Sequence, residues 1–377
     1  MKKIQMVDLV SQYEKIQVEV DAAMLNVVRT AAYIRGSDVS GFEKELATYL
    51  GVKHVISCGN GTDALQIALM ALGLERGDEI ITTSFTFIAT VEVISLLGLT
   101  PIMVDVEPGT FNIDPAQIED AITDKTKAIL PVHLYGQCAD LEKIMDIANR
   151  HNLHVIEDTA QAISADYTFS DGTRKKAGTV GHIGCTSFFP SKNLGCFGDG
   201  GAIFTNDDDL AGQMRIIANH GMKVRYYHEV IGVNSRLDNL QASVLRIKLR
   251  HLDEYRAARN TVAEHYDAAF ANTPQLSTPE RNPNSTHAFH QYTLKCDGLN
   301  RDQLKEHLAK KDIPSMIYYP VPLHHQKAFE VAGMEQKSLP VTEALCKQVI
   351  SLPIHTEMDQ EQLNLITDSI LEFTNSQ

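Results

Sequence analysis

The sequence predicts an α/β protein in which a mainly parallel β-sheet, flanked by helices, is followed by a smaller C-terminal α+β part. Between about residues 50 and 205, short apolar runs of strand length alternate with segments of helical periodicity. This alternation is typical of parallel strands that are joined by helices on both faces of a sheet. The chain has 377 residues, which exceeds the usual size of one hydrophobic core, so about two domains are expected.

Five strands and four helices can be placed in order along this first part of the chain. The predicted strands cover residues 54–58, 79–83, 101–106, 128–132 and 154–158, and the predicted helices cover residues 63–72, 89–97, 115–122 and 141–151. Pro115 follows Asp114 at the start of its helix, where a proline needs no hydrogen-bond partner for its missing N–H. In sheets of this class, ligands bind beyond the carboxyl ends of the strands, so the loops after the strands are the expected place of a site.

A long helix is predicted from about residue 236 to 270, because apolar residues recur there at near-helical spacing. A helix of ~35 residues spans ~50 Å, which is long enough to connect two lobes. Residues 272–285 are rich in Pro, Asn, Ser and Thr and are predicted to be a connector, and strand and helix signals alternate again after residue 286. We therefore expect a large domain at 1–250 and a small α+β domain at 251–377. The N-terminal segment is assigned to the large domain, with packing against the small domain left open.

Charge, hydropathy and cysteine usage exclude several classes of protein. The formal charge is 34 − 48 = −14, which argues against a surface that coats nucleic acid or anionic membrane. No stretch approaches the ~20 apolar residues of a membrane span, and the polar start of the chain predicts no signal peptide. The six cysteines are scattered without a C-x-x-C pair, so neither a disulfide framework nor a metal site is expected. A cytoplasmic enzyme or binding protein without nucleic-acid or membrane partners fits this composition.

The first motif with a chemical meaning is Gly59-Asn60-Gly61-Thr62-Asp63-Ala64, which lies between a predicted strand and a predicted helix. Glycines let backbone N–H groups approach a phosphate, and the N-terminus of a helix favours negative charge. The Thr62 hydroxyl adds a further donor. Read as G-x-G-x-x-A, the same residues also resemble a dinucleotide fingerprint, and a plain strand-to-helix turn is a third interpretation.

A carboxylate and a lysine form the second and third motifs. Asp158 ends an apolar strand, where it could bind a cationic ring nitrogen, a metal or a ribose, or simply cap a helix. Lys192 lies among apolar and small residues and is followed by a glycine-rich stretch. A desolvated amine has a lowered pKa, which makes it nucleophilic and able to form a Schiff base, although a single lysine is more often a surface charge. A phosphate cradle, a carboxylate and such an amine are together what pyridoxal 5'-phosphate (PLP) requires.

Motifs spread over nearly the whole chain strengthen this interpretation. They cover residues 59–65, 156–161, 187–192, 198–201 and 232–238. In this order they resemble the DegT/StrS family of PLP-dependent nucleotide-sugar aminotransferases. The resemblance implies fold type I, in which a mainly parallel seven-stranded sheet carries the cofactor and a smaller C-terminal domain follows. It also implies that PLP alternates with pyridoxamine 5'-phosphate (PMP).

The resemblance implies a role for each matching cofactor residue. Lys192 matches the Schiff-base lysine, and Asp158 the partner of the pyridine nitrogen. The other matches are Gln161 near the phenolic oxygen of the ring, Phe87 stacked on the ring, and Ser187 with Gly61 and Thr62 on the phosphate. Asn234 matches an asparagine that reaches the phosphate from a neighbouring subunit, which implies a homodimer with shared sites; its other interpretation is a cap of the long helix.

The resemblance also implies the substrates. Glutamate is the expected amino donor, and the segments 187–192, 225–228 and 232–238 look most like the branch that aminates C3 of UDP- or dTDP-linked ketosugars. Arg236 matches a substrate-contacting arginine, and Tyr319 and His324 are further candidates, together with His325. Arg35 and the basic loop 170–176 depart from the family pattern, and either could meet substrate charge or lie in solvent.

Three alternatives stay open at this stage. A nicotinamide oxidoreductase would leave Lys192, Ser187 and Asp158 unexplained. A PLP-dependent sugar dehydratase relative can carry histidine in place of the imine lysine, so Lys192 argues against that version. A PLP-loaded sensor without turnover should carry an additional nucleic-acid domain or a broken site, and neither is seen in the sequence.

Overall fold

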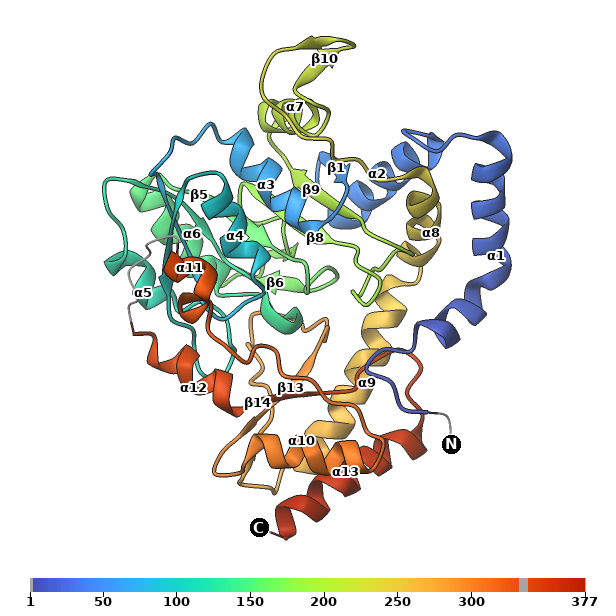
Figure 1. Ribbon diagram of the computed structural model, residues 1–377, viewed down its shortest axis with the longest axis vertical. Helices are drawn as coiled ribbons and strands as arrows, with labels where there is room; N and C mark the ends of the chain where they lie inside the picture. The colour runs from blue at the N-terminus through green and yellow to red at the C-terminus, as the bar shows by residue number, and fades with distance from the viewer. Residues whose placement is uncertain (1–2, 332–337, 377) are drawn as a thin grey trace.

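A seven-stranded sheet forms the centre of the computed structural model, which describes residues 3–331 and 338–376 (Figure 1). The strands in spatial order are β1 (His54–Cys58), β9 (Gly201–Thr205), β8 (Ile183–Ser187), β5 (His154–Asp158), β4 (Thr126–Leu130), β2 (Glu79–Thr83) and β3 (Thr100–Val104). Only β9 runs antiparallel to its neighbours in this sheet. The predicted α/β class with a mainly parallel sheet is therefore confirmed.

The predicted strands agree with the structure except for small shifts in register. The segments 54–58, 79–83 and 154–158 are strands with those bounds, whereas β3 and β4 begin and end one or two residues earlier than expected. Strand β4 ends at Leu130 because the next residue is Pro131, which has no N–H to donate to the ladder. Strands β8 and β9 were not predicted: β8 is rich in small and polar residues, and the apolar run of β9 is only three residues long, Ala202 to Phe204.

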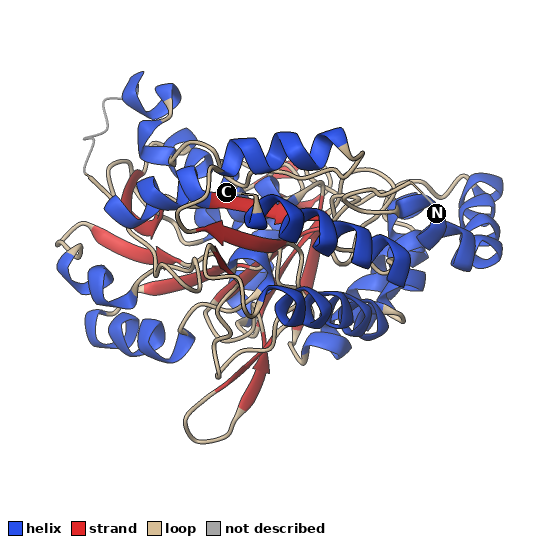
Figure 2. Ribbon diagram, turned by 90° about the horizontal axis from the view of Figure 1, so that it is seen from below, coloured by secondary structure: helices blue, strands red, loops and turns tan. Residues whose placement is uncertain are grey.

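Helices cover both faces of the sheet (Figure 2). Successive side chains of a strand point to opposite faces of the sheet, and two neighbours in β2 show which helices cover each face. Ile80 packs in one buried cluster with α3, α4 and α7, whereas Ile81 packs in another with α5 and α6. Behind β1 and β9, Phe42 and Leu245 belong to a third cluster, which α2 and α8 form. The helices are α2 (Ser37–Leu50), α3 (Gly61–Ala71), α4 (Ala89–Leu96), α5 (Pro115–Asp120), α6 (Leu141–His151), α7 (Asp208–Ile217) and α8 (Asn239–Leu249).

The C-terminal part has its own sheet and its own buried cluster. Three antiparallel strands, β12 (Leu276–Ser277), β13 (Tyr292–Cys296) and β14 (Val349–Leu352), pack with α9 (Leu252–Phe270), α10 (Arg301–Lys310) and α13 (Gln360–Asn375). A segment with η2 (Leu323–His325), α11 (Lys327–Val331) and α12 (Pro340–Gln348) returns towards the large sheet. Ile4 lies in the C-terminal cluster, and Lys15 pairs with Glu357, so the N-terminal segment does pack against this part.

The single long helix predicted at about 236–270 is wrong in detail. Helix α8 starts at Asn239, and a break at Arg250 and His251 separates it from α9. At the break, i→i+3 hydrogen bonds replace the α-helical ones, and His251 leaves the helical region at φ −102° and ψ 1°. The break lets Leu249 and Leu252 pack into one cluster. The division of the chain into 1–250 and 251–377 stays a prediction.

The remaining elements complete the fold. They are α1 (Leu9–Thr30), η1 (Leu134–Gly136), and two hairpins, β6 (Asp166–Thr168) with β7 (Arg174–Lys176) and β10 (Met222–Val224) with β11 (Tyr227–His228). Helix α1 packs beside α8, at the right of Figure 1. Among the described helices, none is both long enough and apolar enough to cross a membrane.

Candidate active site

A cavity of about 740 Å³ opens beyond the carboxyl ends of the parallel strands. It receives residues from the loops that follow β1, β2, β4, β5 and β8, and from the segment that precedes η2. This is the edge at which sheets of this class bind ligands. Eight residues singled out in the sequence line it: Gly61, Thr62, Phe87, Asp158, Gln161, Ser187, Lys192 and Tyr319.

The glycine motif forms an anion cradle at the N-terminus of α3. Asn60 caps the helix, and its side chain accepts a hydrogen bond from the N–H of Asp63 at 2.8 Å. Because the first N–H groups of a helix have no partner inside it, the amides of Gly61 and Thr62 stay available to a ligand. A Cβ on Gly61 would lie 2.6 Å from the Cβ of Ser187, so only glycine lets the helix end and the serine approach this closely. The result is a set of neutral donors suited to a phosphate.

Asp158 lies at the end of β5, where it is almost fully buried. Its Oδ2 accepts a hydrogen bond from Thr90 Oγ1 at 3.0 Å, and its Oδ1 accepts one from the N–H of Ala160 at 3.1 Å. Burial raises the pKa of this carboxyl, while both hydrogen bonds and the nearby Lys192 act in the opposite direction. The carboxylate is thus held in an apolar site, where a cationic partner would favour its charged form. It does not cap a helix.

Lys192 is half-buried in the same cavity, on the loop after β8. Loss of solvent lowers the pKa of its amine to about 8, and Asp158 only partly counteracts this effect. A lysine with such a pKa carries a useful fraction of neutral, nucleophilic amine near neutral pH. The surface-charge interpretation of this residue is therefore not supported.

Gln161, Tyr319 and Phe87 form one side of the cavity. The side-chain oxygen of Gln161 accepts a hydrogen bond from the N–H of Tyr135 at 2.7 Å, and its Nε2 donates to the Tyr319 hydroxyl at 3.2 Å. The Phe87 ring is 56% exposed, and its centroid lies 6.4 Å from that of Tyr319. An exposed ring at the mouth of a cavity is available for stacking, whereas a core residue would be buried.

Three predicted residues lie outside this cavity in the single chain. Arg35 and Arg236 line a second cavity of about 540 Å³, next to Arg215. Asn234 is exposed on the segment that follows the β10–β11 hairpin. The suggestion that Asn234 caps the long helix is wrong, because Asp238 occupies the N-cap position of α8.

His324 and the basic loop are also placed away from the cavity. His324 is buried, with Nδ1 2.7 Å from Ser84 Oγ, so the structure does not bring it to the cavity as a substrate ligand. In the predicted loop, Arg174 and Lys176 form ion pairs with Asp166 at 2.6 Å and 3.1 Å. These paired charges favour the interpretation of the loop as a solvated hairpin.

Two residues that the sequence analysis missed are close to Asp158 and Lys192. Thr90 lies in α4, and nothing in the sequence shows which carboxylate its hydroxyl contacts. His290 lines the cavity from the C-terminal part, and its buried Nδ1 has no hydrogen-bond partner among the described residues. Burial, with Lys192 and Arg259 nearby, holds the pKa of His290 well below its usual value.

The donor set fits PLP at each of its functional groups. The cradle at Gly61 leaves room that a Cβ would fill, and it offers amide and hydroxyl donors to a phosphate. Lys192 supplies a desolvated amine for the aldehyde, and Asp158 supplies a buried carboxylate for the pyridine nitrogen. A nicotinamide dinucleotide would need neither of the last two groups.

Comparison with known proteins agrees with this geometry. The model of the DegT/DnrJ/EryC1/StrS aminotransferase family matches residues 14–371. The chain belongs to this family. The match covers far more than half of the chain, and it confirms that the protein is an aminotransferase, as predicted.

Curated relatives match this family member over almost its whole length. A "pleiotropic regulatory protein" of Geobacillus stearothermophilus is 46% identical over 98% of both chains. A UDP-2-acetamido-2-deoxy-3-oxo-D-glucuronate aminotransferase of Pseudomonas aeruginosa is 45% identical over 96% of this chain and 98% of its own. A dTDP-3-amino-3,4,6-trideoxy-alpha-D-glucose transaminase of Streptomyces venezuelae is 40% identical over 98% and 96%.

Solved structures of relatives support the fold and the cofactor class. DesV of S. venezuelae has a TM-score of 0.94 and 39% identity, with 99% of both chains covered. NtdA of Bacillus subtilis, described with bound cofactor PMP, has a TM-score of 0.88 and 32% identity over 100% of this chain and 86% of its own. The predicted pyridoxal cofactor is confirmed at the level of the family.

Proposed function

We propose that this aminotransferase moves the amino group of glutamate to the C3 keto group of a UDP- or dTDP-linked sugar, and that it works as a homodimer. The observation that carries the proposal is the convergence of Lys192, Asp158 and the Gly61 cradle in one cavity. Relatives named for amination at C3 of a UDP-linked and of a dTDP-linked sugar support the substrate class. Such a reaction belongs to amino sugar biosynthesis, for a surface polysaccharide or another glycan.

The cofactor, when bound, supplies an electron-accepting ring that stabilises negative charge on the substrate carbon. Gly61, Thr62 and Ser187 would hold its phosphate, and Asp158 would keep its ring nitrogen protonated; all four residues line the cavity. Nζ of Lys192 would hold the aldehyde carbon of the cofactor. As a free amine, Nζ of Lys192 would act as the general base that takes the proton from the substrate carbon, and as the ammonium it would donate that proton to C4' of the cofactor. A pKa near 8 suits both tasks, because donor and acceptor forms of the amine are then both accessible.

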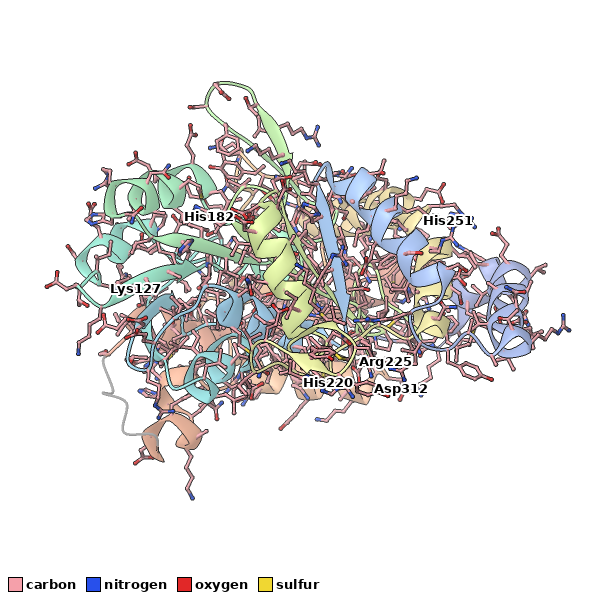
Figure 3. All side chains as sticks on the ribbon, turned by 90° about the horizontal axis from the view of Figure 1, so that it is seen from above. Lys127, His182, His220, Arg225, His251 and Asp312 are labelled. Carbon is pink, nitrogen blue, oxygen red and sulfur yellow. The ribbon has the colours of Figure 1, made fainter. Side chains whose placement is uncertain are left out.

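In the proposed dimer, Asn234 and Arg236, which do not line the cavity of their own chain, belong to the cavity of the partner subunit. Asn234 and Arg236 follow the β10–β11 hairpin, on which Arg225 lies (Figure 3). This hairpin and the residues after it expose large side chains, with Tyr226 at 76% and Ile231 at 87% exposure. Exposed apolar side chains grouped on one segment are typical of an interaction surface. We place Asn234 at the phosphate and Arg236 at the substrate of a partner subunit.

The location we propose is the cytoplasm. All six cysteines are free and buried, and no pair forms a disulfide. Free thiols are the rule in a reducing compartment, in which nucleotide sugars are also made.

The substrate is tested with a panel of enzymatically generated UDP- and dTDP-ketosugars, each incubated with glutamate and analysed by mass spectrometry. We expect an aminosugar product from a 3-keto substrate and 2-oxoglutarate from glutamate. If every ketosugar fails while simple 2-oxo acids react, the sugar assignment is overturned.

The shared site is tested by mixing two inactive variants. In the proposed dimer, each site takes Lys192 from one chain and Asn234 from the other. A heterodimer of Lys192→Ala and Asn234→Ala chains should therefore contain one site that lacks both residues and one site in which both are native. We expect partial recovery of activity after subunit exchange, together with a dimer in analytical ultracentrifugation. A monomer, or no recovery in proven heterodimers, contradicts the proposal.

A further inference from the structure

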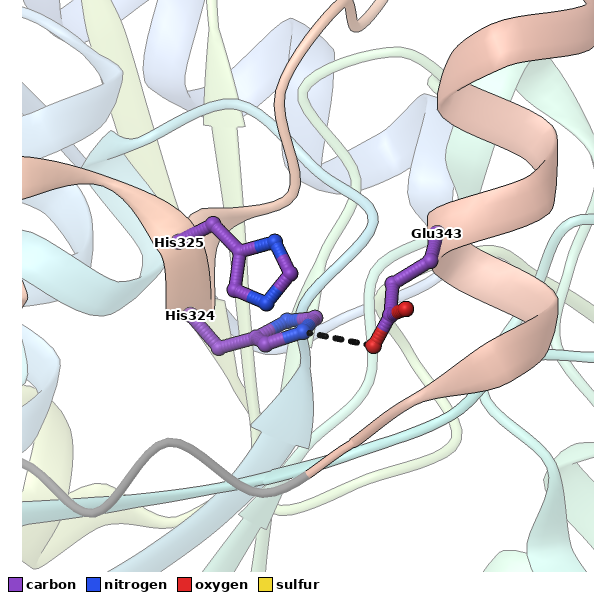
Figure 4. Close-up of side chains that lie close together, drawn as sticks. All are labelled: His324, His325 and Glu343. Carbon is purple, nitrogen blue, oxygen red and sulfur yellow. Dashed lines mark hydrogen bonds and ion pairs between the residues drawn. The ribbon is translucent and has the colours of Figure 1, made fainter.

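Two histidines and a glutamate lie together outside the cavity described above. His324 and His325 belong to the turn η2, and Glu343 belongs to α12 (Figure 4). One potential ligand atom from each residue can be chosen so that all three lie within 4.8 Å of one another. His324 is buried, Glu343 is half-buried and His325 is exposed, so the cluster reaches from the interior to the surface.

The distance between His324 and Glu343 is better suited to a metal site than to a hydrogen bond. The Nε2 of His324 lies 3.4 Å from Oε1 of Glu343, which is long for a charge-assisted hydrogen bond. Two ligands at ~2.0–2.1 Å from one tetrahedral zinc ion are separated by ~3.3–3.4 Å. The two atoms therefore already have the spacing of neighbouring ligands. The exposed His325 can join them by rotation of its side chain.

Surrounding groups orient both of these ligands. The Nδ1 of His324 lies 2.7 Å from Ser84 Oγ, so Nε2 is the ring nitrogen that faces Glu343. Oε1 of Glu343 accepts hydrogen bonds from the N–H of Leu339 at 3.0 Å and from Ser338 Oγ at 3.2 Å. Metal-binding histidines and carboxylates typically have such supporting partners.

We propose that His324, His325 and Glu343 bind one divalent ion of the zinc class, with water as the fourth ligand. Two imidazoles and a carboxylate are a ligand set that zinc accepts, whereas magnesium and calcium prefer oxygen ligands alone. The ion would tie η2 to α12. It would also stiffen the link to the loop after β2, because the N–H groups of Leu323 and His324 donate to Ser84.

This site is tested by calorimetric titration of zinc chloride into the PLP-loaded enzyme after treatment with a chelator. We expect one tight site per chain. His325→Ala and Glu343→Gln should each lower the zinc affinity by at least ~10-fold, since even the loss of a supporting partner costs ~10–100-fold. The matched control is His251→Ala. His251, labelled in Figure 3, is paired with Glu254 at 2.9 Å and is not part of a three-ligand cluster among the described residues, so its loss should leave the affinity unchanged.

A second readout separates ligand loss from misfolding. Zinc should raise the midpoint of thermal unfolding of the wild type and of His251→Ala, but not that of His325→Ala, whose exposed side chain is dispensable for folding. X-ray absorption of the zinc-loaded enzyme should show N/O ligands at ~2.0–2.1 Å, with one imidazole fewer in His325→Ala. The proposal is overturned if the wild type binds no zinc, or if both ligand variants bind it as tightly as the wild type.

Discussion

The hydroxyl of Thr90 donates a hydrogen bond to Oδ2 of Asp158 at 3.0 Å. The two residues are 68 positions apart in the chain, and the contact joins the first turn of α4 to the end of β5. The other carboxylate oxygen is held by the N–H of Ala160. The two hydrogen bonds therefore orient Asp158, and they oppose the rise in its pKa that burial causes.

Replacing Thr90 with valine should weaken cofactor binding without disturbing the fold. The hydrogen bond ends on a carboxylate, and such bonds contribute ~1.5–3 kcal/mol, so the cofactor affinity should fall roughly 10- to 100-fold. Thr90→Ser keeps the hydroxyl and should restore most of the affinity. Equilibrium titration of cofactor-free protein with PLP measures both variants. Equal affinities for Thr90→Val and Thr90→Ser contradict the prediction.

Replacing Gly61 with alanine should damage the phosphate cradle. The added Cβ would lie 2.6 Å from the Cβ of Ser187, so α3 and the serine must move apart, at a cost of about 1–3 kcal/mol. We expect a loss of cofactor affinity of at least ~10-fold by titration with PLP. Gly212→Ala is the matched control, because Gly212 lies inside α7 with open space around its Cβ. That variant should bind PLP normally and unfold at an equal or slightly higher temperature.

The rate at which cofactor-free protein captures PLP should follow the ionisation of Lys192. With a pKa of about 8, the fraction of neutral Lys192 amine rises ~10-fold per pH unit below pH 8 and levels off above pH 8. For a lysine with an ordinary pKa, this fraction would continue to rise up to about pH 10. Between about pH 8 and 10.4 the folded chain binds fewer protons here than the unfolded chain, so this group adds stability as the pH rises through that window. Stopped-flow absorbance at a series of pH values measures the rate.

Lys192→Ala is the control for this pH profile. It should abolish transamination and the visible absorbance band of the bound cofactor, although Lys248, whose pKa is also lowered to about 8, remains. Lys248 is buried outside the cavity and donates to the backbone oxygen of Gly195 at 2.8 Å. Retained turnover in Lys192→Ala would falsify the assignment of this lysine.

Replacing Glu157 with glutamine should destabilise the protein strongly. This fully buried carboxylate accepts hydrogen bonds from the N–H groups of Gly178, Val180 and Gly181 and from Nε2 of His133. Glutamine would set an NH₂ group against these donors, so we expect a loss of about 3 kcal/mol in the free energy of unfolding. Denaturant titration measures it. Glu254→Gln, at an exposed site, is the control and should be unchanged.

The sequence by itself determined the class of the fold and the cofactor class, and it predicted eight residues that line the cavity. Periodicity located β1, β2 and β5 because parallel strands buried on both faces are continuous apolar runs. Lys192, Asp158 and Gly61 were predicted because each carries a chemical function in a recognisable local motif. Local chemistry of this kind depends on neighbours in the chain, which the sequence contains.

Only the tertiary structure decided which of the remaining residues meet. In the folded chain Thr90 contacts Asp158, and His324 contacts Ser84 and does not line the cavity. The expected long helix is broken at His251. The tertiary structure also placed Glu343 beside the two histidines. These contacts join residues that are far apart in the chain or depend on packing between elements. No local pattern encodes them, because the sequence does not show which hydroxyl, imidazole or carboxylate groups are buried or which of them lie within hydrogen-bonding distance of one another.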